Sequence, residues 1–225
     1  AAREHYAMIV WIGVNSVVSG STTPLAEEKE FPAIVLPAAN ALPGVTSTMT
    51  GANTLVSGDY HFTDLTMRSN STLNITGPAT IVLDSFTSAS NTNININATN
   101  GEVNFYVKGK FDMNSNTVIS STTQKPKDLR FWVTTDNYTG YETGTGNPAL
   151  PVNMDSNTNL YAIVYAPNAV MNLDSNGHIY GTLMSKKILW NSNSGIHYDE
   201  ALGRLGNTTP PRYTTKAWKE FTPAQ

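Results

Sequence analysis

A repeated pattern around six Ser-Asn pairs most constrains how this 225-residue chain can fold. An apolar residue stands four positions before each Ser, and another stands three positions after each Asn. A recurring pattern of this kind indicates a stack of similar units, because one such unit cannot bury its own apolar side chains. The pairs are Ser69-Asn70, Ser90-Asn91, Ser115-Asn116, Ser156-Asn157, Ser175-Asn176 and Ser192-Asn193.

The apolar residues on both sides of each pair recur at every second position. Met171 and Leu173 precede Ser175, for example, and Ile179 follows it. A period of two indicates strands whose alternate side chains face inward. Because the Ser-Asn pair interrupts this period, we expect it to form a corner between two short strands.

One interval between pairs is about twice as long as the others. Ser115 and Ser156 are 41 residues apart, which predicts an additional coil without a Ser-Asn pair. Its strand is expected at 129–133, where Leu129, Phe131 and Val133 alternate with other residues.

These patterns predict an all-β fold, a single-stranded parallel β-helix (β-solenoid) with irregular loops and a short C-terminal cap. We expect it to be right-handed, as most parallel crossovers are. Four prolines between residues 21 and 58 argue against central strands there and favour an extended segment along the outside of the solenoid. The predicted organisation is a first coil at 1–20, an extended linker packed on the solenoid at 21–58, coils at 59–206 with a loop insertion at 136–151, and a C-terminal tail at 207–225.

The composition excludes several classes of function. Charged residues make up 14% of the chain, well below the usual quarter, and the formal net charge is -3. No basic stripe is visible, so we expect no nucleic-acid partner. There are no cysteines for disulfides, thiol catalysis or Cys-based zinc sites. The most apolar run, Met8 to Val18, is too short to cross a bilayer, so we expect no membrane span in this chain.

The six Asn residues of the repeat form one column in the predicted stack. An Asn amide can bond the Asn in the coil above and the one below, as well as the local backbone. We predict an internal structural ladder at one corner of the solenoid. An exposed Asn row that binds a ligand is the alternative. The column is Asn70, Asn91, Asn116, Asn157, Asn176 and Asn193.

Two carboxylates directly precede the Ser of their repeats and should stack in adjacent coils. Asp155 and Asp174 supply oxygen ligands of the kind that Ca²⁺ prefers, so a Ca²⁺ site is one interpretation. The other is that both are ordinary solvent-facing turn residues. His178 and His197 fall in different columns, and we expect that they do not converge on one metal ion. No other cofactor is predicted.

An outward-facing column of aromatic residues is the best candidate for a contact surface. Tyr161, Tyr180 and His197 each stand four positions after a repeat Asn and alternate with inward apolar residues. They could contact a partner, because exposed aromatic residues often do so. Alternatively, cross-strand stacking of these rings could serve stability alone.

Several segments of the C-terminal half resemble a known family. They are Tyr165-Ala-Pro-Asn168, then Ile179-Tyr180-Gly181, and then His197-Tyr-Asp-Glu-Ala-Leu202. This YAPN…HYDEAL pattern resembles the β-solenoid domain of bacterial pilus-assembly and cell-surface proteins, which often follows a PilX-type, pilin-like segment. The resemblance covers most of residues 5–220 and implies a non-enzymatic surface module, sometimes carried by minor pilins.

We therefore expect a non-enzymatic extracellular structural or adhesive module at the cell surface, associated with a pilus or the envelope. Its partners would be pilus or other cell-surface proteins, or a surface glycan ligand. The sequence contains no Gly-rich phosphate loop, nucleophile elbow or HExxH motif. A carbohydrate-binding or carbohydrate-active β-helix is the second reading, and a polymer-forming or ice-binding solenoid is the third.

Overall fold

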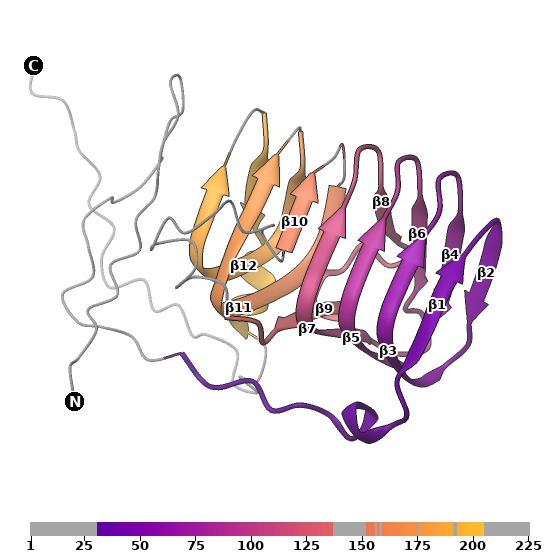
Figure 1. The fold of residues 1–225 in the computed structure, drawn as a ribbon. Coiled ribbons are helices and arrows are strands. Elements are labelled where there is room, and N and C mark those ends of the chain that lie inside the picture. The colour runs from indigo at the N-terminus through magenta and orange to yellow at the C-terminus, as the bar shows by residue number, and fades with distance from the viewer. Residues whose placement is uncertain are drawn as a thin grey trace, which may run out of the picture.

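The chain forms a parallel β-solenoid of about six turns (Figure 1). The computed structural model describes residues 31–136 and, apart from residues 156, 158, 175, 191 and 192, residues 152–204. The predicted fold class is thereby confirmed. The predicted first coil at 1–20, nearly all of the predicted loop at 136–151 and the tail at 207–225 lie outside the described residues.

Two parallel sheets make up the described part of the solenoid, with the strands of successive coils paired in chain order. The predicted strand at 129–133 is confirmed as β9, which pairs with β7 and β11. The larger sheet contains β1 (Val45–Met49), β3 (Gly58–Met67), β5 (Ala79–Ser88), β7 (Val103–Met113), β9 (Leu129–Val133), β10 (Val152–Asp155), β11 (Asn159–Asp174), β12 (His178–Trp190) and β13 (Gly195–Tyr198). The smaller sheet contains β2 (Ala52–Leu55), β4 (Thr72–Thr76), β6 (Asn93–Asn97) and β8 (Val118–Ser121).

Three short 3₁₀ helices connect or follow these strands: η1 (Ala38–Ala41), η2 (Pro126–Asp128) and η3 (Glu200–Arg204). The last of them begins beside Asp199, whose carboxylate accepts a hydrogen bond from the backbone N–H of Ala201 at 2.9 Å. The backbone N–H of Asp199 in turn donates to the carbonyl oxygen of Gly181 at 3.0 Å, which attaches the start of the helix to β12. No helix in the described part of the chain has the length and apolar character needed to cross a membrane.

Strand register aligns the apolar positions of the repeat from coil to coil. The residues four positions before each Ser are paired from coil to coil: Leu65, Phe86, Phe111, Val152, Met171 and Ile188. The residues three positions after each Asn also pair, as Leu73, Ile94 and Ile119 in the smaller sheet and as Leu160, Ile179 and Ile196 in the larger one.

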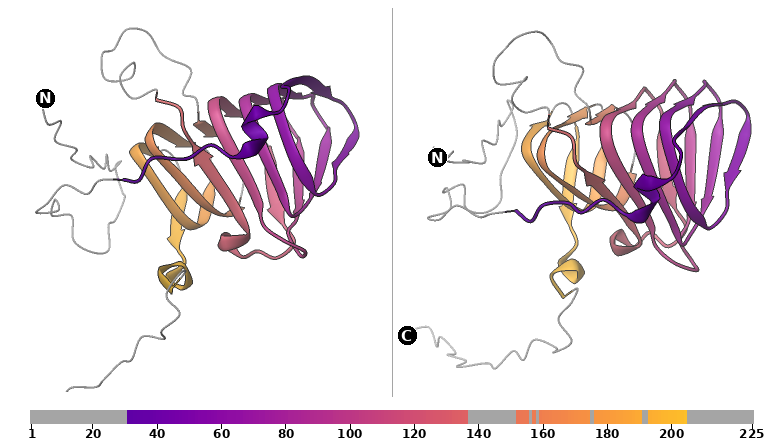
Figure 2. Two further views of the ribbon diagram at one scale, coloured as in Figure 1. Left: turned by 90° about the horizontal axis from the view of Figure 1, so that it is seen from below. Right: turned by 60° about the horizontal axis from the view of Figure 1, so that its bottom comes forward.

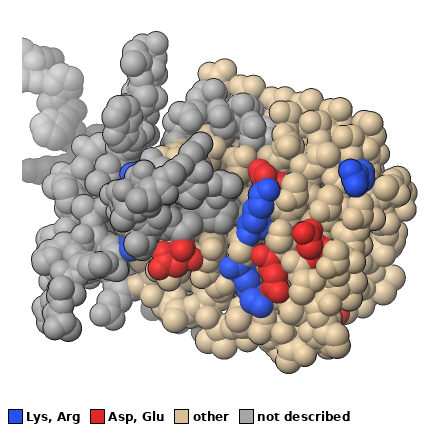
Figure 3. Space-filling model, viewed as in Figure 1, with Lys and Arg blue, Asp and Glu red and all other residues tan. Residues whose placement is uncertain are grey.

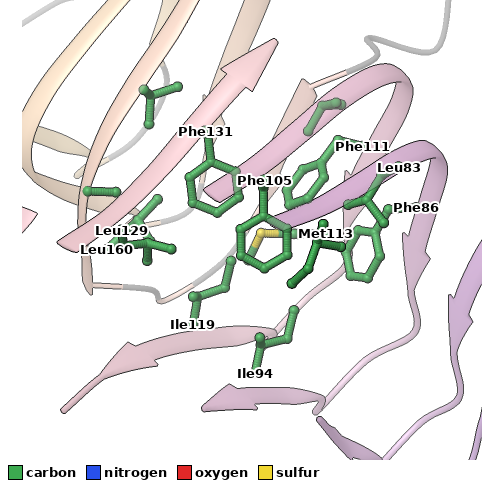
Figure 4. Close-up of a cluster of buried hydrophobic side chains, with 14 of the residues drawn as sticks. Leu83, Phe86, Ile94, Phe105, Phe111, Met113, Ile119, Leu129, Phe131 and Leu160 are labelled. Carbon is green, nitrogen blue, oxygen red and sulfur yellow. The ribbon is translucent and has the colours of Figure 1, made fainter. Parts of the chain in front are cut away.

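Aromatic rings stack on one another in the interior of the solenoid (Figure 4). The ring centroids of Phe86 and Phe111 are 4.8 Å apart, and those of Phe105 and Phe131 are 4.9 Å apart. Phe111 also meets Phe131 edge to face at 5.7 Å. All four side chains are buried. Full burial of one such side chain contributes about 1.5–3 kcal/mol, so this interior supplies much of the stability of the coils.

The prediction that the solenoid coils begin at residue 59 is wrong. Residues 45–55 already form β1 and β2, which pair in parallel with β3 and β4. Their corner is shorter than the others, and Gly51 takes the left-handed backbone conformation there with φ of 61°. Because this corner contains glycine and no Ser-Asn pair, the repeat pattern does not detect the coil.

Residues 31–44 form an extended strap along the outside of the solenoid, from the level of β11 to β1 (Figure 2). At one end the Tyr165 hydroxyl donates a hydrogen bond of 2.6 Å to the carbonyl oxygen of Pro32. At the other end the carbonyl oxygen of Leu42 lies 2.8 Å from Nδ1 of His61. Between these contacts, Ala39 in η1 is buried.

Candidate binding surfaces

The Asn residues of the repeat lie at a solvent-exposed corner, so the prediction of an internal column is wrong. Asn70, Asn91, Asn116 and Asn176 have φ between 60° and 64°, the left-handed conformation that Asn tolerates better than most residues. Extended strands enter and leave this corner, and the left-handed residue turns its side chain outward. All six Asn side chains are exposed.

A ladder of side-chain hydrogen bonds nevertheless connects four of these Asn residues. The amide nitrogen of Asn116 donates to Oδ1 of Asn91 at 3.1 Å, and that of Asn157 donates to Oδ1 of Asn116 at 3.0 Å. The amide nitrogen of Asn176 then donates to Oδ1 of Asn157 at 3.0 Å. Because these side-chain amides already bond one another, the structural interpretation of the column is favoured over ligand binding.

In the first three repeats, the residue after the Asn fills the interior of the corner. Ser71, Thr92 and Thr117 are fully buried. The hydroxyl of Thr117 lies 3.0 Å from that of Thr92 and 2.8 Å from that of Ser88, so these buried polar groups are satisfied by one another.

The outward column four positions after each repeat Asn changes character along the solenoid. In the first coils it holds Asn74, Asn95 and Ser120, and the amide nitrogen of Asn95 donates to Oδ1 of Asn74 at 3.0 Å. The Ser120 hydroxyl donates to Oδ1 of Asn95, also at 3.0 Å. In the last coils the same position holds aromatic rings, so one side of the solenoid is polar at its start and aromatic at its end.

The aromatic part of this column is a continuous ring stack. The rings of Tyr161 and Tyr180 are 4.8 Å apart with an interplanar angle of 16°, and those of Tyr180 and His197 are 4.4 Å apart with an angle of 9°. His197 is exposed and the two tyrosines are half-buried. The neighbouring Tyr198 is 61% exposed, which is unusual for so large a side chain. The structure therefore brings together all three residues predicted to form a contact surface, and stacking between them fixes their orientation.

His178 and His197 occupy different columns, as predicted, but their side chains meet. Nδ1 of His178 is 3.1 Å from Nε2 of His197, although Gly195 is the residue directly opposite His178. A Cβ atom at Gly195 would stand 2.4 Å from Nδ1 of His178. The absence of a side chain at Gly195 thus allows His178 to lean diagonally toward His197, which column positions alone do not reveal.

A second aromatic row lies beneath the strap and contains one residue from each of three coils. Tyr106 of β7, Trp132 of β9 and Tyr165 of β11 occupy paired positions. The rings of Tyr106 and Trp132 are stacked at 6.2 Å, and those of Trp132 and Tyr165 meet edge to face at 6.0 Å. The strap residues 32–35 face this row across a groove with a volume of about 340 Å³. Tyr165 belongs to the YAPN segment, which gives that segment a structural role in holding the strap.

Polar side chains next to this row form a connected chain. The indole N–H of Trp132 donates to Oδ1 of Asn104 at 3.1 Å, and the amide nitrogen of Asn104 donates to Glu102 at 3.3 Å. Glu102 forms an ion pair of 2.7 Å with Arg130. Burial raises the pKa of the Tyr106 hydroxyl further above neutral pH. The group is a hydrogen-bond donor and acceptor in its neutral form.

Asp155 and Asp174 occupy paired backbone positions in β10 and β11, as adjacent coils require. Their side chains lie outside the described residues, and the Ca²⁺ site stays a prediction. Elsewhere in the described part of the chain, no group of three or more His, Cys, Asp or Glu side chains could hold a metal ion.

On the face shown in Figure 3, charged residues are sparse, and several of them lie beside residues of the opposite sign. Asp84 is the best connected of these groups: Lys108 lies 2.8 Å from its Oδ1, and Nε2 of His61 lies 3.2 Å from the same atom. Burial by itself would raise the pKa of the Asp84 carboxyl. The hydrogen bonds from Lys108 and His61 outweigh that effect and hold the pKa below its usual value.

Residues 26–205 match a protein family described as a domain of unknown function (DUF7305), and the chain belongs to this family. The matched region begins before the strap and ends with η3, so it includes every coil described above. Comparisons with curated proteins and with solved structures gave no match.

Proposed function

We propose that this member of the DUF7305 family is a non-enzymatic structural and adhesive module on the outside of the cell, attached to a pilus or another surface assembly. The aromatic stack of Tyr161, Tyr180 and His197 carries the proposal. Tyrosine provides a large contact area with little loss of side-chain entropy on binding, and here stacking has already fixed the rings.

The architecture supports a display function. Stacked coils give a solenoid with extended, regular surfaces, which repeat proteins commonly use to bind partners. Outward positions here are held in place by Asn–Asn bonds or by ring stacking, so a partner would meet a preorganised surface. The YAPN…HYDEAL resemblance to pilus-assembly solenoids supports the same location and the same class of partner, namely pilus or other cell-surface proteins.

The test is binding of the purified chain to cells of the source organism and to pili sheared from them. The double variant Tyr161→Ser/Tyr180→Ser is expected to reduce binding at least tenfold, because it removes the exposed ring surface while leaving the core unchanged. Asn95→Ser is the matched control, since it changes the same outward column in an earlier coil. Equal binding by the wild type and the double variant would reject this surface as the adhesive site.

The predicted loop at 136–151 can be tested in the same assay by deleting residues 138–149. If binding is unchanged, the loop has no part in recognition. Pilin genes beside the gene for this chain would favour pilus attachment over another surface assembly.

A further inference from the structure

The groove beneath the strap has the size of a small-molecule site. Its volume of about 340 Å³ falls within the range of about 300–1,000 Å³ that is typical of such sites. For comparison, the space in the interior beside Met113, Leu160 and Ile179 measures about 10 Å³ and has room for one water molecule at most. The groove is thus large enough for an organic ligand, and it lies outside the core.

The lining of the groove combines flat apolar surfaces with hydrogen-bonding groups. Tyr106, Trp132 and Tyr165 form its floor, and the strap residues 32–35 form its opposite wall. The three rings come from adjacent coils. The ring centroid of Trp132 is 6.2 Å from that of Tyr106 and 6.0 Å from that of Tyr165. The apolar C–H face of a pyranose ring fits against such a ring, while the hydroxyls at the edge of the sugar need hydrogen-bond partners around it.

Those partners lie beside the floor. Asn104 precedes Tyr106 on the outward face of β7, Glu102 stands just before this strand, and Arg130 precedes Trp132 on β9. Carboxylate, amide and guanidinium are planar groups with several donors or acceptors, so each has hydrogen-bonding capacity beyond the bonds that it makes to its neighbours here. The bond between Trp132 and Asn104 fixes the indole, which reduces the entropy cost of stacking a ligand on it.

Charge distinguishes between classes of sugar. Glu102 and Arg130 neutralise each other through their 2.7 Å ion pair. An anionic sugar would have to compete with Glu102 for Arg130, whereas a neutral one could use both groups without breaking the pair. The strap already places an extended, Pro-containing backbone against this row through the bond from Tyr165 to Pro32, so the remaining space does not require a second peptide.

We propose that this groove binds a neutral saccharide, with Trp132 as the central stacking residue. The inference rests on the proposed adhesive function in that it names a glycan as one ligand of the module. It concerns a different surface from the stack of Tyr161, Tyr180 and His197.

The experiment is a titration of the ¹⁵N-labelled chain with maltohexaose, cellohexaose, chitohexaose and mannohexaose, following the indole N–H signal of Trp132 in heteronuclear NMR spectra. The assignment of that signal comes from its loss in Trp132→Phe. At least one neutral oligosaccharide is expected to shift the signal with a Kd in the millimolar range or below. In the variants, binding is followed through the backbone amide signals that shift in the wild type: Trp132→Ala should weaken binding at least tenfold, and Trp132→Phe should weaken it less because a ring remains.

Control variants separate this inference from the proposed function. Tyr161→Ser/Tyr180→Ser should leave oligosaccharide binding unchanged, and Trp132→Phe should leave an intact fold as judged by thermal melting. No shift with any of the four neutral oligosaccharides would overturn the inference, as would tighter binding of oligogalacturonate. Displacement of a bound oligosaccharide by a peptide with the sequence of residues 31–37 would support the location. Binding of that peptide together with no binding of any of the four oligosaccharides would identify the groove as a peptide site and refute the glycan proposal.

Discussion

Replacing Asn116 by Ala tests how the exposed corner is stabilised. Asn116 has φ of 60° and forms two side-chain hydrogen bonds, to Asn91 at 3.1 Å and from Asn157 at 3.0 Å. The left-handed conformation costs an ordinary L-residue about 1–2 kcal/mol, and Asn tolerates it better, so the change to Ala adds about 1 kcal/mol. The two bonds are exposed and contribute about 0.5 kcal/mol each. The variant should therefore lose about 2 kcal/mol in free energy of unfolding.

Asn95→Ala is the matched control for the hydrogen bonds. Asn95 also takes part in two side-chain bonds, with Asn74 and Ser120, both at 3.0 Å, but it lies in the strand β6 with ordinary extended backbone. Its replacement should cost about 1 kcal/mol, since it loses the bonds alone. Asn116→Gly keeps access to the left-handed conformation and should cost less than Asn116→Ala.

The assay is urea unfolding followed by circular dichroism, supported by thermal melting. A loss of about 2 kcal/mol should lower the melting temperature by roughly 4–8 °C in a domain of this size. If Asn116→Ala costs no more than Asn95→Ala, the backbone conformation contributes nothing and the reasoning is refuted. If neither substitution has an effect, the ladder bonds contribute nothing as well.

Three further outcomes follow from the core, the charges and the glycines. Phe111→Ala should cost about 3–5 kcal/mol in urea unfolding because it opens a cavity among buried rings, while Phe111→Leu should cost clearly less. The folded-state pKa of Asp84 is depressed, so its ionised carboxylate stabilises the fold above the unfolded pKa. This contribution is lost as the pH falls through the folded pKa. The free energy of unfolding, measured from pH 6 down to pH 2, should therefore depend less on pH in Asp84→Asn than in the wild type. Gly195→Ala should separate His178 from His197, because the new Cβ would stand 2.4 Å from Nδ1 of His178. A weaker nuclear Overhauser effect between the two imidazole rings would show this, and an unchanged effect would contradict it.

The apolar frame of the repeat was sufficient to predict the coils from β3 onward from the sequence. Each position holds an inward side chain, and inward positions must recur wherever strands stack in register. The same rule identified β9 without a Ser-Asn pair, because Leu129, Phe131 and Val133 keep the alternation. The coil at 45–55 could not be found in this way, because Gly51 replaces the Asn and the corner is shorter.

The direction of a corner residue depends on its backbone conformation, and periodicity does not report that. Alternation breaks at the Ser-Asn pair, so counting positions cannot tell whether Asn or its neighbour is inside. Asn in the left-handed conformation points out, and the small Ser71, Thr92 or Thr117 fills the corner. The preference of Asn for positive φ was the available signal for an exposed turn.

The two aromatic rows could be predicted from the sequence to different extents. Tyr161, Tyr180 and His197 keep a constant distance from the repeat Asn, and so the column could be predicted. Tyr106, Trp132 and Tyr165 could not be aligned, because Trp132 lies in the long interval that lacks a Ser-Asn reference.

The strap explains why the second row should be the more selective of the two surfaces. The stack of Tyr161, Tyr180 and His197 faces outward along the solenoid, and any flat partner can approach it. The row of Tyr106, Trp132 and Tyr165 is faced by residues 32–35, so a ligand must fit between two walls. Tyr165→Phe removes the hydroxyl that holds Pro32 and leaves the ring in place. If the strap forms one wall of the site, this variant should weaken binding of a neutral oligosaccharide in the NMR titration and leave adhesion to cells through the first surface unchanged. Equal oligosaccharide binding by Tyr165→Phe and the wild type would show that the rings alone are sufficient.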